Sequence, residues 1–217
     1  MRKHLLFFGL GFLTLASAWG AAPAADENEL VEIRKVDPTI VIELRYASAN
    51  NFVHRAIYPP AMPALIRASV AQRLIVAQNY LSERGYGLKI WDAYRPQDAQ
   101  QQLFKAMGNR SYVADPTGQR GSYHTRGVAV DATLVDRSGQ EVAMPTGFDN
   151  FTPAAMLAYR GDNALVRFNL TMLQKAMARA GFYGLRTEWW HFCAGDYAKY
   201  PLVPQIKLPA SLAAPAQ

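Results

Sequence analysis

The chain has 217 residues, of which 50% are hydrophobic, 12% aromatic and 18% charged, and its formal net charge is +6 at pH 7. These values predict one domain with a sizeable core, and they exclude an intrinsically disordered chain. The basic residues are scattered rather than gathered in a run, so we expect no nucleic-acid partner.

The N-terminus has the layout of a secretory signal peptide. The positive start Met1–His4 precedes an apolar run over residues 5–15 and the small residues 16–18. That run is shorter than the ~20 residues that a membrane-spanning helix needs. We therefore expect residues 1–25 to be a signal peptide and disordered start, cleaved near residues 18–25. Residues 26–217 would then form one periplasmic domain without a stable membrane anchor.

Hydrophobic patterns and turn residues divide the rest of the chain into helices and strands. We expect strands at residues 39–46, 87–92, 128–134 and 182–192, a possible short strand within 139–149, and helices at residues 63–84, 97–107 and 163–180. Segments rich in Gly, Pro or Asn at 47–60 and 108–121 are predicted loops. Helices and strands mix without strict β-α-β alternation. The pattern therefore predicts an α+β fold, a small, mainly antiparallel sheet with helices packed on it.

Two short stretches, SYHTRGVAVD at residues 122–131 and EWWH at residues 188–191, hold most of the side chains suited to chemistry. His124, Asp131 and His191 form a common ligand set for one catalytic Zn²⁺, with the fourth position open to water. Glu188 is then placed to act as general base on that water. Either histidine alone would also suit a hydrogen-bonded core position. Together the motifs predict a zinc hydrolase with its site in a central cleft.

The spacing within the first stretch predicts a bend. His124 and Asp131 are seven residues apart, so on one straight strand they would point to opposite faces. Gly127 permits a bend between them. After that bend Val130 can pack in the core while Asp131 points into the cleft.

The spacing within the second stretch predicts a helical turn. Glu188 and His191 are three residues apart, which places two side chains on one face of a turn but not of a straight strand. The intervening Trp189 and Trp190 would wall the site, or would simply be core aromatics.

Arg95 follows a predicted strand end in the segment DAYRP. Its guanidinium could stabilise an oxyanion there, or could form a structural salt bridge to Asp92, and the residues alone do not favour either role.

Cys193 is the only cysteine, so we expect no disulfide, and a small buried residue is a better interpretation for it than a ligand. The chain lacks a GxSxG elbow, an HExxH helix and a glycine-rich phosphate loop.

The pattern SxHxxGxAxD, with EWWHF after it and DAYRP before it, resembles the D-alanyl-D-alanine dipeptidase family of zinc peptidases, part of the LAS-type peptidoglycan peptidase group. The resemblance covers about residues 36–200. It implies His124, Asp131 and His191 as zinc ligands and Glu188 as catalytic base. It also implies that Arg95 stabilises the tetrahedral intermediate.

The resemblance extends to three further residues. It implies that Ser122 contacts the substrate, that Asp149 neutralises the substrate ammonium, and that Tyr46 lines the same pocket. Two departures stand out. The family loop commonly reads Asn-Phe-x-Gly, whereas His54 follows Asn51-Phe52-Val53 here. Many relatives act in the cytoplasm, whereas this chain carries an expected export signal.

The implied reaction is hydrolysis of a small peptide substrate, D-Ala-D-Ala, to two D-alanines. The altered loop at His54 keeps open a D,D-carboxypeptidase or endopeptidase acting on longer peptidoglycan stem peptides. The alternative from another class is a non-catalytic, zinc-dependent cell-wall binding module. Glu188 argues against that module, because a binding protein needs no base beside the metal.

Overall fold

The computed structural model describes residues 26, 28–59, 61–118 and 121–204. The expected signal peptide and the end of the chain from residue 205 lie outside the described residues. The strands are β1 (Leu30–Glu32), β2 (Val41–Ile42), β3 (Leu65–Arg67), β4 (Tyr86–Asp92), β5 (Ala129–Asp136), β6 (Phe182–Leu185) and β7 (Glu188–Ala194). The helices are α1 (Ile33–Val36), α2 (Ala68–Ser82), α3 (Gln97–Met107) and α4 (Ala164–Arg179). Single 3₁₀ turns lie at Arg45–Ala47, His124–Arg126, Pro153–Ala155 and Tyr197–Lys199.

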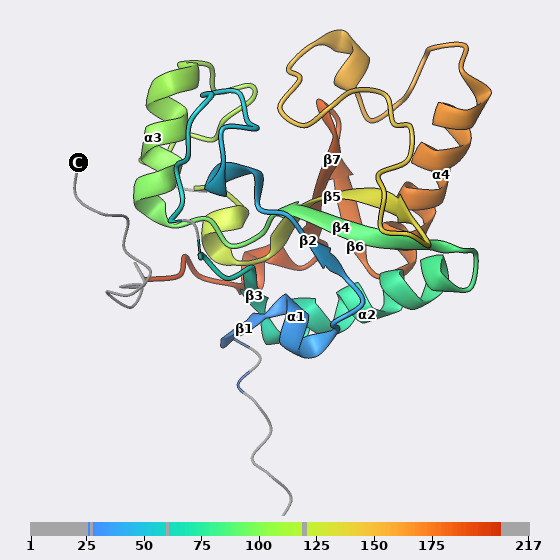
Figure 1. Cartoon of the computed structure of the whole chain (residues 1–217). Coiled ribbons are helices and arrows are strands. Elements are labelled where there is room, and N and C mark those ends of the chain that lie inside the picture. The colour runs from blue at the N-terminus through green and yellow to red at the C-terminus, as the bar shows by residue number, and fades with distance from the viewer. Residues whose placement is uncertain (1–25, 27, 60, 119–120, 205–217) are drawn as a thin grey trace, which may run out of the picture.

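The strands form a five-stranded sheet in the order β2-β4-β5-β7-β6 and a separate pair, β1 with β3 (Figure 1). In the larger sheet β2 runs parallel to β4, and the other neighbours are antiparallel. The predicted α+β fold with a small, mainly antiparallel sheet is confirmed.

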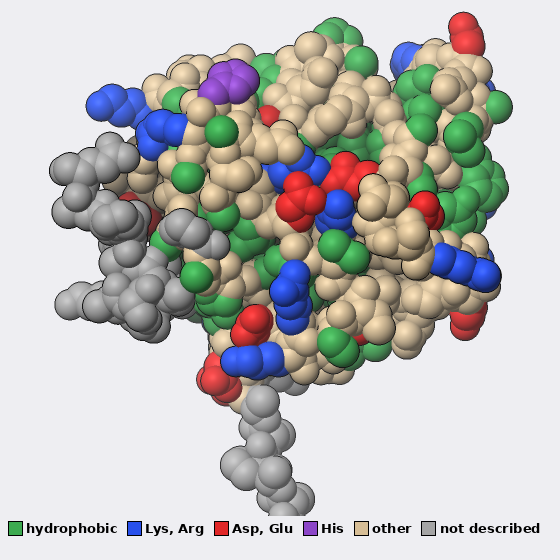
Figure 2. All heavy atoms as spheres, viewed as in Figure 1, with side chains coloured by type: hydrophobic (Ala, Val, Ile, Leu, Met, Phe, Trp, Pro, Cys, Tyr) green, Lys and Arg blue, Asp and Glu red, His purple; other side chains and the backbone are tan. Residues whose placement is uncertain are grey.

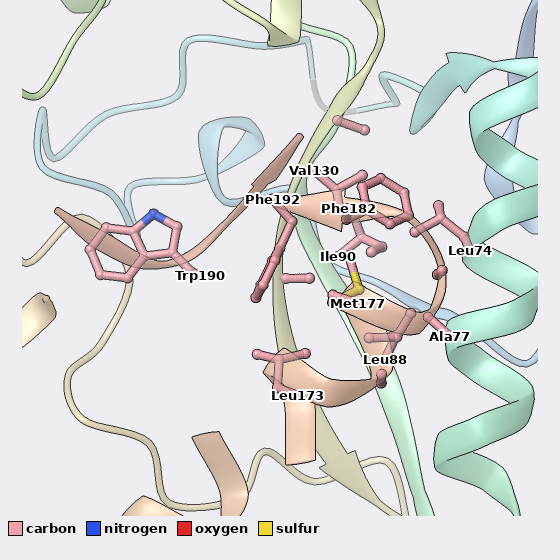
Figure 3. Close-up of a cluster of buried hydrophobic side chains, with 14 of the residues drawn as sticks. Leu74, Ala77, Leu88, Ile90, Val130, Leu173, Met177, Phe182, Trp190 and Phe192 are labelled. Atoms are coloured by element: carbon pink, nitrogen blue, oxygen red, sulfur yellow. The ribbon is translucent and has the colours of Figure 1, made fainter. Parts of the chain in front are cut away.

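The main core lies between the sheet and two helices. The buried residues of α2 include Val70, Leu74, Ala77 and Leu81, which recur every three or four positions and form one apolar face. Figure 3 shows how side chains from α2 (Leu74, Ala77), β4 (Leu88, Ile90), β5 (Val130), α4 (Leu173, Met177), β6 (Phe182) and β7 (Phe192) meet in this cluster. Burying this much apolar surface fixes the positions of the central strands.

The other side of the sheet carries α3 and the long loops. In Figure 1, α2 runs beneath the sheet, whereas α3 and the loops rise above it. A second, smaller core supports this side and consists of Tyr46, Tyr58, Met62, Tyr94, Ala99, Leu103 and Val113. Figure 2 shows acidic and basic side chains grouped near the middle of the visible face.

Ion pairs fasten the loop before the first 3₁₀ turn to the sheet. Arg45 contacts Glu141 at 2.6 Å, and Lys89 of β4 contacts both Glu43 at 3.0 Å and Glu141 at 3.1 Å. The network thereby holds the neighbour of Arg45, Tyr46, at a fixed place on this side of the molecule.

Two element predictions near the N-terminus were partly wrong. Only Val41–Ile42 of the strand expected at 39–46 is extended in the sheet, because the chain turns into a 3₁₀ turn at Arg45–Ala47. The helix expected at 63–84 begins at Ala68, since Leu65–Arg67 pairs with Leu30–Glu32. Pairing with a distant strand therefore overrides the local helical pattern.

Two further differences lie near the C-terminal half. The strand expected at 182–192 is a hairpin, in which β6 and β7 are joined across Arg186 and Thr187. The short strand expected within 139–149 is reduced to an isolated bridge between Glu141 and Val135. Among the described residues, no helix combines the length and apolar character needed to cross a membrane.

Candidate active site

Three side chains from separate segments converge on one point. His124 lies in a 3₁₀ turn, Asp131 lies on β5, and His191 lies opposite Asp131 on β7. The Nε2 atom of His124 lies 3.1 Å from Nδ1 of His191 and 3.3 Å from Oδ1 of Asp131, and the latter two atoms are 3.0 Å apart. All three residues are buried. The three predicted ligands are thus brought together within the described structure.

The geometry of this cluster suits one metal ion. Donor atoms bound at about 2.0–2.1 Å to a tetrahedral zinc lie about 3.3 Å from one another. The three distances of 3.0, 3.1 and 3.3 Å are close to that value. Two imidazoles and a carboxylate therefore fit a zinc ion without rearrangement of the backbone.

The protonation states of the cluster also suit a metal. The Nδ1 atom of His124 lies 2.8 Å from the carbonyl oxygen of Ala93, which only accepts, so Nδ1 carries the proton and the lone pair is on Nε2. Burial lowers the pKa of His191, and the hydrogen bond and charge of Asp131 only partly offset it. Burial raises the pKa of Asp131, but His124 and His191 outweigh it and hold that pKa below its ordinary value. A neutral imidazole and an ionised carboxylate are the forms that bind metals.

The predicted bend at Gly127 is confirmed. Gly127 has φ 68°, in the left-handed region, and its N–H donates to the carbonyl oxygen of His124 at 2.9 Å. A Cβ atom there would lie 2.7 Å from Cδ2 of Leu30. Beyond the bend Val130 packs in the core while Asp131 joins the cluster. Glycine is needed here both for backbone freedom and for space.

Glu188 lies in the same cavity as the cluster, but not on the predicted helical turn. It begins β7, and the register between β6 and β7 shifts between Gly184, which pairs with Phe192, and Leu185, which pairs with Glu188. This irregularity lets Glu188 and His191 reach one cavity although they are three residues apart.

The environment of Glu188 disfavours its charged form. Its Oε1 atom is buried and has no hydrogen-bond partner among the described residues. Burial raises the pKa of Glu188 well above its ordinary value, and the charges of Asp131 and Asp149 add to the increase. Such a carboxylate is a good proton acceptor.

The two neighbouring tryptophans have different surroundings. Trp190 lines the cavity, and in Figure 3 it lies on the far side of the core cluster from α2. Trp189 is not among the lining residues; its Nε1 atom donates to Thr146 at 2.9 Å and its ring packs against Trp91. Of the two interpretations left open, a wall of the site fits Trp190 and a core position fits Trp189, because successive strand residues point to opposite faces.

Arg95 forms the salt bridge that was one of its two possible roles, and its guanidinium also faces the cavity. Its Nε and Nη2 atoms donate to Oδ2 of Asp92 at 2.9 and 2.7 Å, which is the predicted salt bridge. The same guanidinium lines the cavity, and Nη2 lies 3.7 Å from Asp131. Asp92 is completely buried and also accepts from Tyr58 at 2.7 Å. Asp92 therefore holds the arginine at the edge of the site.

Asp149 and Tyr46 form an acidic corner of the cavity. The Tyr46 hydroxyl donates to Oδ1 of Asp149 at 3.2 Å, and the backbone N–H of Phe52 donates to Oδ2 at 3.2 Å. Burial raises the pKa of Asp149 to about 7, although the N–H of Phe52 lowers it. A half-buried carboxylate of this kind gains from pairing with a cation.

Ser122 lines the cavity beside the cluster. Its Oγ atom accepts from the N–H of His124 at 3.2 Å, and its carbonyl oxygen accepts from the hydroxyl of Thr125 at 2.7 Å. Ser122 thus stabilises the turn that presents His124, and its side chain faces the same space.

The cavity has a volume of about 490 Å³, and several residues in its wall were not foreseen from the sequence. Part of the wall comes from the loop between α3 and Ser122, and the aromatic rings of Tyr112 and Phe151 pack there with centroids 5.0 Å apart. Aromatic residues in otherwise polar loops were the available signal.

Two residues discussed from the sequence lie outside this lining. His54 is exposed and has φ 53°, so it occupies a left-handed position that a glycine would adopt without strain. Cys193 is partly buried, and burial raises the pKa of its thiol. Neither residue is among those that line the cavity with the three-residue cluster.

A His–Asp–His donor set beside a buried glutamate has the arrangement of a mononuclear metallohydrolase. The sequence comparisons identify the particular family. A family model described as D-ala-D-ala dipeptidase, a peptidase family, matches residues 26–207. The chain belongs to this family of peptidases.

Individual relatives agree with the family match. The D-alanyl-D-alanine dipeptidase of Escherichia coli strain K12 is 38% identical over 182 residues, which cover 82% of this chain and 91% of the relative. The D-alanyl-D-alanine dipeptidase of Enterococcus faecium is 27% identical, covering 71% of this chain and 85% of its own. Among solved structures, VanYB in complex with D-alanine-D-alanine is 16% identical, covers 63% of this chain and 75% of its own, and has a TM-score of 0.40.

Proposed function

We propose that the chain is a zinc-dependent dipeptidase that hydrolyses D-Ala-D-Ala to two D-alanines. The observation that carries the proposal is the convergence of His124, Asp131 and His191 within 3.3 Å of one another, in a cavity that also contains Glu188. Membership of the D-Ala-D-Ala dipeptidase family supports the substrate.

The three-residue cluster would hold the zinc. When bound there, zinc supplies a Lewis acid that makes water more acidic and polarises the scissile carbonyl group. Glu188 takes a proton from the attacking water and passes it to the leaving amine. Its buried Oε1 atom, which has no partner among the described residues, is available for this transfer.

Arg95 stabilises the negative charge that develops on the carbonyl oxygen. Burial would lower the pKa of its guanidinium, but Asp92 and other acidic neighbours more than offset this, so the pKa is raised well above its ordinary value. Arg95 therefore stays charged throughout the reaction.

The ammonium end of the substrate meets an acidic corner of the cavity. Asp149 receives the ammonium group of the dipeptide, since a cation relieves the cost of its half-buried charge. The Tyr46 hydroxyl holds the Asp149 carboxylate in place by donating a hydrogen bond of 3.2 Å to its Oδ1 atom. Ser122 contacts the substrate beside His124. A free ammonium group at Asp149 would distinguish a dipeptide from the interior of a longer peptide.

A second candidate, a D,D-carboxypeptidase or endopeptidase on longer stem peptides, is favoured by one observation. The cavity volume of about 490 Å³ lies within the range of about 300–1,000 Å³ that drug-sized ligands occupy. D-Ala-D-Ala is smaller than such ligands. The choice between the two substrates therefore depends on how the amino end of the peptide is accommodated.

The deciding experiment measures D-alanine release by the zinc-loaded protein from D-Ala-D-Ala and, in parallel, from a pentapeptide stem. Glu188→Gln with zinc bound is the control for catalysis. Release from the dipeptide alone supports the dipeptidase, and preferential release from the pentapeptide supports the second candidate. Silence on both substrates with metal bound would contradict both.

We also propose that the protein is exported to the periplasm. The proposal rests on the basic, apolar and small-residue order of residues 1–18. Cell fractionation of the full chain beside a version that begins at residue 26 tests it. Retention of the full chain in the cytoplasmic fraction would contradict export.

A further inference from the structure

Gln100, near the start of α3, uses both ends of its amide group. Its Oε1 atom accepts a hydrogen bond from Nη1 of Arg95 at 2.9 Å, and its Nε2 atom donates to the carbonyl oxygen of Ala114 at 2.7 Å. Gln100 is completely buried. Arginine only donates and a carbonyl oxygen only accepts, so the two partners fix the orientation of the amide. Gln100 therefore joins Arg95 to the 109–118 loop, which forms one wall of the cavity.

Asp92 by itself holds Arg95 along one edge only. Two guanidinium nitrogens, Nε and Nη2, donate to the same carboxylate oxygen, so the plane could tilt about that oxygen. The bond from Nη1 to Gln100 fixes a second point. These hydrogen bonds use three of the five guanidinium N–H groups. Arg95 lines the cavity, so the other two are available to a substrate oxygen.

Gln97, one turn earlier on α3, provides an internal comparison. Its Nε2 atom donates to the carbonyl oxygen of Pro116 at 3.0 Å, so it holds the same 109–118 loop by the same kind of bond. Among the hydrogen bonds of the described residues, Gln100 accepts one from the Arg95 guanidinium, whereas Gln97 accepts none from it. The two glutamines therefore share a loop-holding contact but differ in the contact to the arginine and in burial, since Gln97 is half-buried.

We propose that Gln100 is a positioning residue that fixes the orientation of the Arg95 guanidinium and couples it to the cavity wall. This inference rests on the proposed function, because the stabilising role of Arg95 belongs to that proposal. A misplacement of about 1 Å in a reacting group can lower a rate about 100-fold. The hydrogen bond from Gln100 would hold the Arg95 guanidinium against displacements of about that size.

The main test compares Gln100→Met with Gln97→Met, since methionine keeps the length of the side chain and removes its hydrogen bonds. Hydrolysis of D-Ala-D-Ala by the zinc-loaded proteins gives kcat and KM. Gln100→Met is expected to lower kcat about 10- to 100-fold with little change in KM, because the displaced group acts on the transition state. Gln97→Met is expected to stay within about threefold of the unmodified protein.

A double-mutant cycle shows whether Gln100 acts through Arg95. Arg95→Lys keeps a positive charge but loses the planar fork that spans Asp92 and Gln100. In that background Gln100→Met is expected to cause no further loss of kcat beyond about twofold. An equal loss in both backgrounds, or equal kcat values for Gln100→Met and Gln97→Met, would overturn the inference.

A second measurement does not depend on activity. Limited trypsin digestion at Arg110, an exposed residue of the 109–118 loop, should become faster in both glutamine variants to a similar extent. If that result appears while the unmodified protein releases no D-alanine, the proposed function fails and the link from Gln100 to the loop stands. An unchanged digestion rate for Gln100→Met would overturn the link itself.

Gln100→Glu keeps the test decisive if the methionine variant does not fold. The glutamate retains an acceptor for Arg95 but replaces the donor to Ala114 with a second oxygen, which breaks that contact. A kcat within about threefold of the unmodified protein supports positioning through Arg95, whereas a loss of about 10-fold or more overturns it.

Discussion

Asp131 and His191 are register partners on neighbouring antiparallel strands, and Oδ1 of the carboxylate lies 3.0 Å from Nδ1 of the imidazole. Asp92, which holds Arg95, is in turn the register partner of Asp131 on β4. The adjacent strands β4, β5 and β7 therefore place Asp92, Asp131 and His191 in one row across the sheet. The stiffness of the hydrogen-bonded sheet keeps these groups in fixed positions.

Removal of metal is expected to lower the melting temperature. A ligand at 100 times its Kd stabilises a folded protein by about 2.7 kcal/mol if it does not bind the unfolded chain. Calorimetric melting with zinc and with a chelator measures the difference, and His191→Ala should abolish it. His54→Ala, at an exposed site outside the cluster, is the matched control. A zinc-dependent shift that persists in His191→Ala would contradict the ligand assignment.

Glu188→Gln is expected to lower kcat by about 100- to 10,000-fold, the usual contribution of a positioned general base. Zinc affinity should be unchanged, because Glu188 is not one of the three clustered donors. Steady-state kinetics with a zinc titration separates these effects. Activity close to that of the unmodified protein, with zinc bound, would show that another group takes the proton.

Asp149→Asn is expected to change stability in a pH-dependent way. Burial raises the pKa of Asp149 from 3.8 to about 7, so the folded state binds this proton more tightly than the unfolded state. The carboxyl therefore imposes no cost below about pH 4, an increasing cost between about pH 4 and 7, and a full cost of the order of 4 kcal/mol above that range. Asparagine removes the cost and tolerates the left-handed backbone at φ 57°.

Melting curves of the metal-free protein at pH 4.5 and pH 8 test this expectation. Asp149→Asn should gain on the order of 4 kcal/mol over the unmodified protein at pH 8 but only about 1 kcal/mol at pH 4.5. The same change should raise KM for D-Ala-D-Ala, since the partner of the ammonium is lost. A gain that is equal at both pH values would contradict the titration of Asp149.

Gly127→Ala is expected to destabilise the protein by at least about 1–2 kcal/mol, the cost of a left-handed backbone for a residue with a Cβ atom. The contact of 2.7 Å with Leu30 adds to that cost. Denaturant unfolding measures the loss, and zinc titration should show weaker binding because His124 and Asp131 flank the bend. Gly139→Ala, which also has positive φ but open space around its Cβ position, separates backbone strain from the clash.

The sequence by itself predicted the three residues of the His–Asp–His cluster, the bend and the fold class. His124, Gly127 and Asp131 lie within one stretch of eight residues, so their relation depends on local backbone geometry that a pattern can express. The apolar periodicities of α2 and α4 and the composition of the central strands predicted a helix-covered, mainly antiparallel sheet. These features depend on short-range sterics and on the burial of one apolar face.

Only the tertiary structure decided how distant groups meet. Residues 65–67 form a strand because residues 30–32 pair with them, and Glu188 faces the cavity because the register of β7 against β6 is irregular. The bond from Gln100 to Ala114, fourteen residues further along the chain, depends on how the 109–118 loop folds back over α3. The periodicity of the sequence does not predict such contacts. They form because buried polar groups need hydrogen-bond partners, and the folded chain decides which partners lie within reach.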